Sequence, residues 1–335
     1  MSKSANSVMD LLDAKGRNYA YSDAIEESFE KKYKYMSPDQ QLLEFVMDKV
    51  AMTSDCYVLY AVAYFGAASK EMIIDFLKMK ARTSPALLIT KRDDVDEHIS
   101  TRLRVLCDRG YLYSFKYAPE DGAVTLYGVT EEAYVVLRQR LDKVTFSYNH
   151  GFAHKSVRRI LDWAGASYVG ARLMQSPKVQ FELERTFFNK KIKNSFLPFE
   201  FRSRDAKGNI YYVAGMNGNW DMDPDTQSEH DYDEWLGVQV ELLWCYLTFR
   251  STKGTPVAVV CVRDSATLIK TAGIIAKAEG LRGCLDRIVF TGEGILRSIG
   301  EEGMLTDATR DGAFLQMRIE GNQVVFSVLD KAAFV

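Results

Sequence analysis

The most constraining feature of the sequence is a short helix that ends on a glycine and is followed at once by a strand, within residues 94–117. Asp94 and Glu97 have the spacing of a capping box at the helix start. Gly110 stands where a left-handed residue ends a helix. One face of the helix is apolar at helical spacing and predicts burial: Val95, Ile99, Leu103 and Leu106.

The segments around this helix predict the rest of one domain. Two helices come before it, one ending near Phe65 and one capped by Ser69. After it, two strand-like runs flank a turn-rich loop at 118–122 and another helix follows. The order helix, helix, helix, hairpin, helix predicts a winged helix-turn-helix domain at residues 37–145. The polar residues 1–36 would form an N-terminal arm.

The polar face of the helix carries the residues that could contact DNA. In a helix-turn-helix domain this face enters the major groove, where arginine and hydroxyl side chains can bind base edges and phosphates. We expect Ser100, Thr101 and Arg104 to reach base edges. The full set of candidate DNA-contacting residues is Lys91, Arg92, His98, Ser100, Thr101, Arg102, Arg104 and Lys116.

Two other interpretations of the same face stay open. Glu97 and Asp108 are acidic, which favours a plain solvated helix face. The tip of the predicted wing, at 119–121, is also acidic, whereas a wing that follows phosphates favours basic residues. Winged helices can also dock proteins, so a protein-interaction module is the second alternative.

A second domain is predicted over residues 150–335, and its elements mix helices with strands. An amphipathic helix opens it, and a further helix is expected within 176–193. Residues 234–249 fit either a buried helix or a strand. The stretch 255–292 reads as strand, helix, strand, which predicts a βαβ unit with parallel strands. Hairpins are expected at 199–215 and around Glu320–Asn322, so this domain is mixed α/β.

The second domain separates its charges along the chain. Seven bases and two acids lie between Arg185 and Lys207. Phenylalanines are interleaved with them, which is typical of single-strand binding surfaces and also of an ordinary strand pair. The candidate secondary basic surface is formed by Lys190, Lys191, Lys193, Arg202 and Arg204.

The acidic stretch at 221–234 is the one segment that raises the question of catalysis. Asp225, with Glu241 as a second acid, could serve a metal-dependent nuclease. The lysine of an E-x-K element is missing, because the next lysine after Glu241 is Lys253. We therefore expect no catalysis, metal or cofactor, and take 221–234 as a solvated loop or a docking site for a basic partner.

Net charge, cysteine spacing and the length of apolar runs restrict the expected partner and location of the protein. The formal net charge of −2 gives no global attraction to nucleic acid, so any DNA surface must be local. The five cysteines include no C-x-x-C pair, which indicates reduced thiols and a cytoplasmic location. The sequence has no apolar run long enough for a membrane span. Double-stranded DNA is the expected partner, and a homodimer is left open.

Three stretches together resemble the replication-relaxation family of bacterial plasmids and integrative elements: 99–115, 152–161 and 242–294. The resemblance implies a winged helix joined to a restriction-endonuclease-like domain. It also implies a DNA-binding accessory or regulatory role in plasmid replication, transfer or transcription control, with plasmid replication or transfer proteins as partners. The acidic strand that follows the family's P-D element has no counterpart after Pro224–Asp225, which points to an inactive nuclease-like domain.

Overall fold

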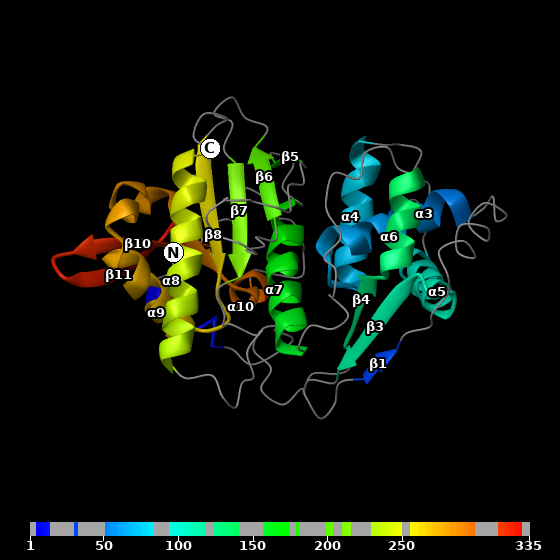
Figure 1. Cartoon of the computed structure of the whole chain (residues 1–335), viewed down its shortest axis with the longest axis horizontal. Coiled ribbons are helices and arrows are strands. Elements are labelled where there is room, and N and C mark those ends of the chain that lie inside the picture. The colour runs from blue at the N-terminus through cyan, green and yellow to red at the C-terminus, as the bar shows by residue number, and fades with distance from the viewer. Residues whose placement is uncertain are drawn as a thin grey trace. The chain divides into compact units, whose positions relative to one another are not determined.

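The computed structural model describes residues 5–13, 30–32, 51–83, 94–117, 124–140, 157–174, 179–180, 199–203, 210–215, 229–249, 255–298 and 314–329. The chain divides into two compact units, each mixing helices and strands (Figure 1). The central unit is Ser22–Ser167, and the terminal unit combines Met1–Tyr21 with Tyr168–Val335. Residues of the predicted arm therefore fall in both units.

Within its described residues, the central unit contains four complete helices, the first part of a fifth and a small antiparallel sheet. The strand order is β1-β3-β4-β2. The elements in chain order are β1 Glu30–Lys32, α3 Ala51–Phe65, β2 Ala68–Ser69, α4 Lys70–Thr83, α5 Val95–Asp108, β3 Leu112–Tyr117, β4 Val124–Val129 and α6 Glu131–Arg140.

The local signals that separate these helices are confirmed. Gly66 ends α3 with a φ of 79°, and Gly110 follows α5 with a φ of 73°, a backbone region that glycine enters without a steric penalty. The N–H of Met72 donates to Ser69 Oγ at 3.3 Å, which caps α4. Thr130 Oγ1 donates to the carbonyl of Gly110 at 3.1 Å and accepts from the N–H of Ala133 at 3.2 Å. It thereby links the end of α5 to the start of α6.

The terminal unit is built on a sheet of seven strands in the order β11-β10-β9-β8-β7-β6-β5. Strands β7, β8 and β9 are parallel to one another, and the other pairs are antiparallel. Its elements are α1 Ala5–Met9, α7 Val157–Met174 (which begins in the central unit), β5 Val179–Gln180, β6 Phe199–Ser203, β7 Ile210–Gly215, α8 Glu229–Phe249, β8 Pro256–Cys261, α9 Ser265–Lys277, a 3-10 helix Glu279–Arg287, β9 Ile288–Thr291, α10 Glu293–Ser298, β10 Leu315–Glu320 and β11 Gln323–Val328.

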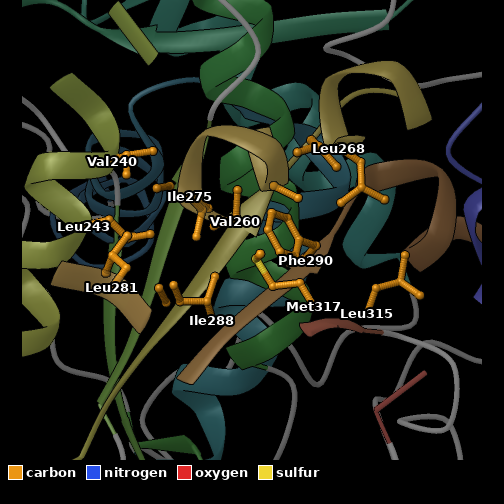
Figure 2. Packing of buried hydrophobic residues seen from close by; sticks show 14 of the residues in the cluster. Val240, Leu243, Val260, Leu268, Ile275, Leu281, Ile288, Phe290, Leu315 and Met317 are labelled. Carbon is orange, nitrogen blue, oxygen red and sulfur yellow. The ribbon is translucent and has the colours of Figure 1, made fainter. Parts of the chain in front are cut away.

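The core of the terminal unit lies between the sheet and the helices packed on it. Figure 2 shows Val260 and Phe290 from two parallel strands surrounded by side chains of α8, α9 and the 3-10 helix. All four residues of β9 are buried, and so are five of the six residues of β8. A parallel strand covered on both faces requires such a continuous apolar run, so the predicted βαβ unit is confirmed.

The N-terminal segment contributes to this core from the other end of the sequence. Val8 and Leu12 are fully buried within it. Asp13 accepts hydrogen bonds from the backbone N–H of Ser265 at 2.8 Å and from its hydroxyl at 2.6 Å, at the start of α9. A Cβ on Gly294 would lie 2.3 Å from the carbonyl oxygen of Leu11, so only glycine fits against this segment.

One local expectation is wrong, and the structure bears on two others. Asp94 makes no side-chain capping hydrogen bond, so the capping box at α5 is not formed. Val179–Gln180, near the start of the stretch 176–193 in which a helix was expected, form strand β5. The rest of that stretch lies outside the described residues, so the helix stays a prediction. The ambiguous stretch at 234–249 is helical, as part of α8. In the described part of the chain, no helix has the length and apolarity that a membrane crossing requires.

Candidate nucleic-acid interface

Helix α5 places its apolar and polar residues on opposite faces, as the sequence predicts. Ile99 and Leu103 are fully buried and Leu106 is 1% exposed, whereas Val95 is only half-buried. The exposed residues of the helix are Asp96, Glu97, Ser100, Thr101, Arg104 and Asp108. The buried residues fix the rotation of α5 about its axis and therefore decide which side chains meet solvent.

Three of the residues predicted to contact base edges lie together on the exposed face. Thr101 and Arg104 are one turn apart, so their side chains are neighbours on the helix surface. The hydroxyl of Ser100 donates to the carbonyl of Asp96 at 2.9 Å. In this conformation the proton is engaged by its own helix, and the Ser100 oxygen has acceptor capacity left for a ligand.

Arg102 lies at the flank of α5 and is engaged by a neighbouring helix. Its guanidinium forms a two-point ion pair with Asp55 of α3, in which Nε lies 2.7 Å from Oδ1 and Nη2 contacts Oδ2. The side chain of Asp55 is 2% exposed and that of Arg102 is 23% exposed. A buried carboxylate needs such a partner, so Arg102 holds α5 against α3, and its expected contact with DNA stays a prediction.

The remaining described candidates lie at the margins of this face. Lys116 is exposed on β3, opposite Thr125 on β4 and Glu30 on β1. His98 is half-buried. Lys70, which was not predicted, forms a 2.6 Å ion pair with Asp96 that joins the start of α4 to the first turn of α5.

The charge balance of the exposed face is slightly acidic. Arg104 is one positive charge between Glu97 and Asp108, and the pair of Lys70 and Asp96 is neutral. Such a face attracts phosphates weakly, so recognition would depend on the direct contacts of Arg104 more than on a general field.

A thiol and a phenol lie behind the end of α5 in their protonated forms. Burial, reinforced by Asp108 and opposed by a hydrogen bond with Ser114, raises the pKa of Cys107 to about 12. Burial, together with Cys107, raises the pKa of Tyr127 to about 12. A reactive thiol requires a lowered pKa, so Cys107 is a packing residue and not a nucleophile. All five cysteines are free.

The other predicted sites are described in part. Glu241 is exposed on α8, a helix, and not at the end of a strand. Arg202 occupies a position in β6 opposite Ile210 of β7. No group of three histidine, cysteine, aspartate or glutamate side chains that could hold a metal ion occurs in the described part of the chain. Candidates outside the described residues are Lys91, Arg92, Lys190, Lys191, Lys193, Arg204 and Asp225.

Asp55 is the residue of this interface that sequence reasoning missed, and its role is structural. It is the one acid of α3, a helix that is otherwise mostly apolar, and Arg102 lies at the flank of a helix with an apolar face. Charged residues are seldom fully buried unless they are paired. A search for opposite charges at apolar positions of two adjacent helices would have suggested this ion pair.

Comparisons with models of known protein families, with curated proteins and with solved structures find no significant match to this chain.

Proposed function

We propose that this protein binds double-stranded DNA through α5, as an accessory or regulatory protein of a mobile genetic element without catalytic activity. The central unit supports the proposal by its element order, α3, β2, α4, α5, β3, β4, with β2 paired to β4. This order is the one expected of a winged helix, in which α4 and α5 would form the helix-turn-helix and α5 would be the recognition helix. The resemblance to the replication-relaxation family gives the proposed setting.

The observation that carries the proposal is the exposure of Arg104 beside Thr101. A guanidinium on the outer face of a recognition helix can donate two parallel hydrogen bonds to guanine. An inward-facing Arg104, paired like Arg102, would have removed the strongest base-contacting candidate.

The acidic neighbours of Arg104 set the form that DNA binding would take. Few bases are present to neutralise phosphates, so we expect weak non-specific binding and a salt slope of only about −3 in a plot of log K against log salt. Specific binding would then depend on a small number of base contacts. This combination is unlike that of a strongly basic non-specific binder.

The terminal unit would act as a platform and not as a nuclease. A restriction-endonuclease-like centre requires an acid and a lysine on one of its central strands. Strand β7, with the sequence IYYVAG, has neither, and Glu241 lies on a helix. The metal-dependent nuclease using Asp225 and Glu241 therefore gains no support from the described residues. Incubating supercoiled plasmid with Mg²⁺ or Mn²⁺, with an Asp225→Ala control, tests it directly.

The experiment for DNA binding starts with selection of a site from a random duplex pool by the full-length protein. Arg104→Ala is then compared with Arg138→Ala, which removes an exposed arginine from α6 of the same unit. We expect Arg104→Ala to weaken binding to the selected site about 5- to 150-fold, and Arg138→Ala to change it less than about twofold. Equal binding by both variants, or a pool with no enrichment, would contradict the proposal.

A protein-interaction module is the second candidate, and the acidity of the α5 face favours it. Glu97 and Asp108 outnumber Arg104 on that face, and a basic partner surface would complement it. Capture of a basic protein that persists after nuclease treatment, and is lost on Glu97→Lys, would support this candidate over DNA binding.

A further inference from the structure

The two sheets have four edges, and one of them differs from the rest. As far as the structure describes them, β2 and β5 are two residues long, and β1 has three residues of which two are lysines. Short length and lysine are common means of keeping an edge strand from pairing with another chain. Strand β11 has six residues, QVVFSV, and is the outermost strand of the large sheet.

The register of β11 shows which of its backbone groups face outward. The N–H of Leu329 donates to the carbonyl of Phe314 at 2.9 Å, and the hairpin pairs Glu320 with Gln323 around its two-residue turn. Hydrogen-bonded pairs alternate along an antiparallel ladder. The N–H and C=O groups of Val324, Phe326 and Val328 therefore point away from β10. No described strand pairs with β11 on that side.

The side chains of β11 do nothing to block pairing. The strand contains no charged residue and no proline, and Val325 is 38% exposed on the outer face of the hairpin. On the inner face, Val324, Phe326 and Val328 pack against the core. The rings of Phe326 and Phe290 form a T-shaped contact with a centroid distance of 6.0 Å. Packing of the inner face fixes the position of β11. The outward-facing backbone groups of β11 are therefore already in place to bind a partner strand.

We propose that β11 pairs with β11 of a second copy of this chain, antiparallel about a two-fold axis at Phe326. This register opposes Phe326 to Phe326 of the partner subunit and Val324 to Val328 of the partner subunit. It engages all three outward-facing residues and gives on the order of six backbone hydrogen bonds. Val325 then lies opposite Ser327 of the partner subunit, on each side of the axis.

A second copy fits this edge because the edge is complementary to itself. A two-fold interface opposes each residue to its counterpart, so a charged strand would bring like charges together. In β11 every opposed pair is neutral, and apolar residues face apolar residues on the inner side. The two sheets would join into one continuous sheet across the axis.

The test is a pair of double variants that differ only in the sign of one charge. Val325→Glu with Ser327→Glu places glutamates opposite each other across the axis, whereas Val325→Glu with Ser327→Lys places opposite charges there. Glutamate suits position 325 within one chain because Arg318 lies opposite on β10, and position 327 faces the neutral Gln316. The two charges also meet within one strand, because positions 325 and 327 share a face of β11. Circular dichroism and urea unfolding of each variant therefore check that both hairpins fold.

Sedimentation velocity over a range of protein concentration measures the assembly. We expect dimers for the natural sequence and for the Glu/Lys variant, and a dissociation constant at least tenfold higher for the Glu/Glu variant. Hydrogen exchange should show concentration-dependent protection in β11 that the Glu/Glu variant loses. A natural protein that stays monomeric overturns the proposal, and so does one whose β11 pairs with a strand of a different protein. Equal dissociation constants for the two variants would also overturn the proposal. Loss of dimers in both variants would overturn the register centred on Phe326.

Discussion

The ion pair between Asp55 and Arg102 gives the sharpest stability prediction, because its two side chains are buried to different extents. Replacing Arg102 by alanine leaves a carboxylate that is 2% exposed without its counter-charge. Replacing Asp55 by alanine leaves a guanidinium that is 23% exposed and can still reach water. Arg102→Ala should therefore destabilise the central unit more than Asp55→Ala.

The magnitudes follow from the same burial. Removing one partner of a fully buried ion pair costs about 3–5 kcal/mol. We expect about 4 kcal/mol for Arg102→Ala and about 2–3 kcal/mol for Asp55→Ala, since the guanidinium keeps part of its hydration. The double change Asp55→Leu with Arg102→Met should cost less than either single change, because no buried charge is left.

The assay is hydrogen exchange of peptides from α3 and α5 as a function of urea, which gives the opening free energy of this unit alone. Asp96→Ala is the matched control. Its ion pair with Lys70 is 71% and 40% exposed, so its loss should cost less than about 1 kcal/mol. The reasoning is refuted if Arg102→Ala costs no more than Asp55→Ala, or if both costs are as small as that of the control.

Two further predictions concern other parts of the chain. Leu12→Ala should destabilise the terminal unit by about 3 kcal/mol, because Leu12 is fully buried; urea unfolding followed by tryptophan fluorescence measures this, and a loss below about 1 kcal/mol would show that the N-terminal segment is dispensable. The thiol of Cys107 has an ordinary pKa of 9.0 and a folded pKa of about 12, so the folded chain keeps a proton that the unfolded chain loses. Stability should therefore fall as pH rises from 9 to 12, and Cys107→Ala should flatten that fall in urea titrations at each pH; an unchanged slope would contradict the assignment.

Much of the central unit could be predicted from the sequence, because its signals are local. The caps and turns at Ser69, Gly66 and Gly110 depend on backbone conformations that a few neighbouring residues decide. The division of α5 into buried and exposed faces follows from helical periodicity. The exposure of Arg104, on which the proposed function rests, was predictable for the same reason.

Only the tertiary structure decided which distant segments belong together. Leu12 packs in the core formed mainly by C-terminal residues, and Arg102 forms an ion pair with Asp55. Strand β1 pairs with β3, which lies more than 80 residues later in the sequence. Position in the sequence does not determine such partners, because they are selected by shape and by the need to pair buried charge. The stretch that forms α8 was undecided because two residues on the exposed face of this helix, Val238 and Trp244, are apolar. Apolar residues at exposed positions obscure the periodicity that separates helix from strand. The sequence thus determined the local conformations of this protein, and packing determined the neighbours of each element.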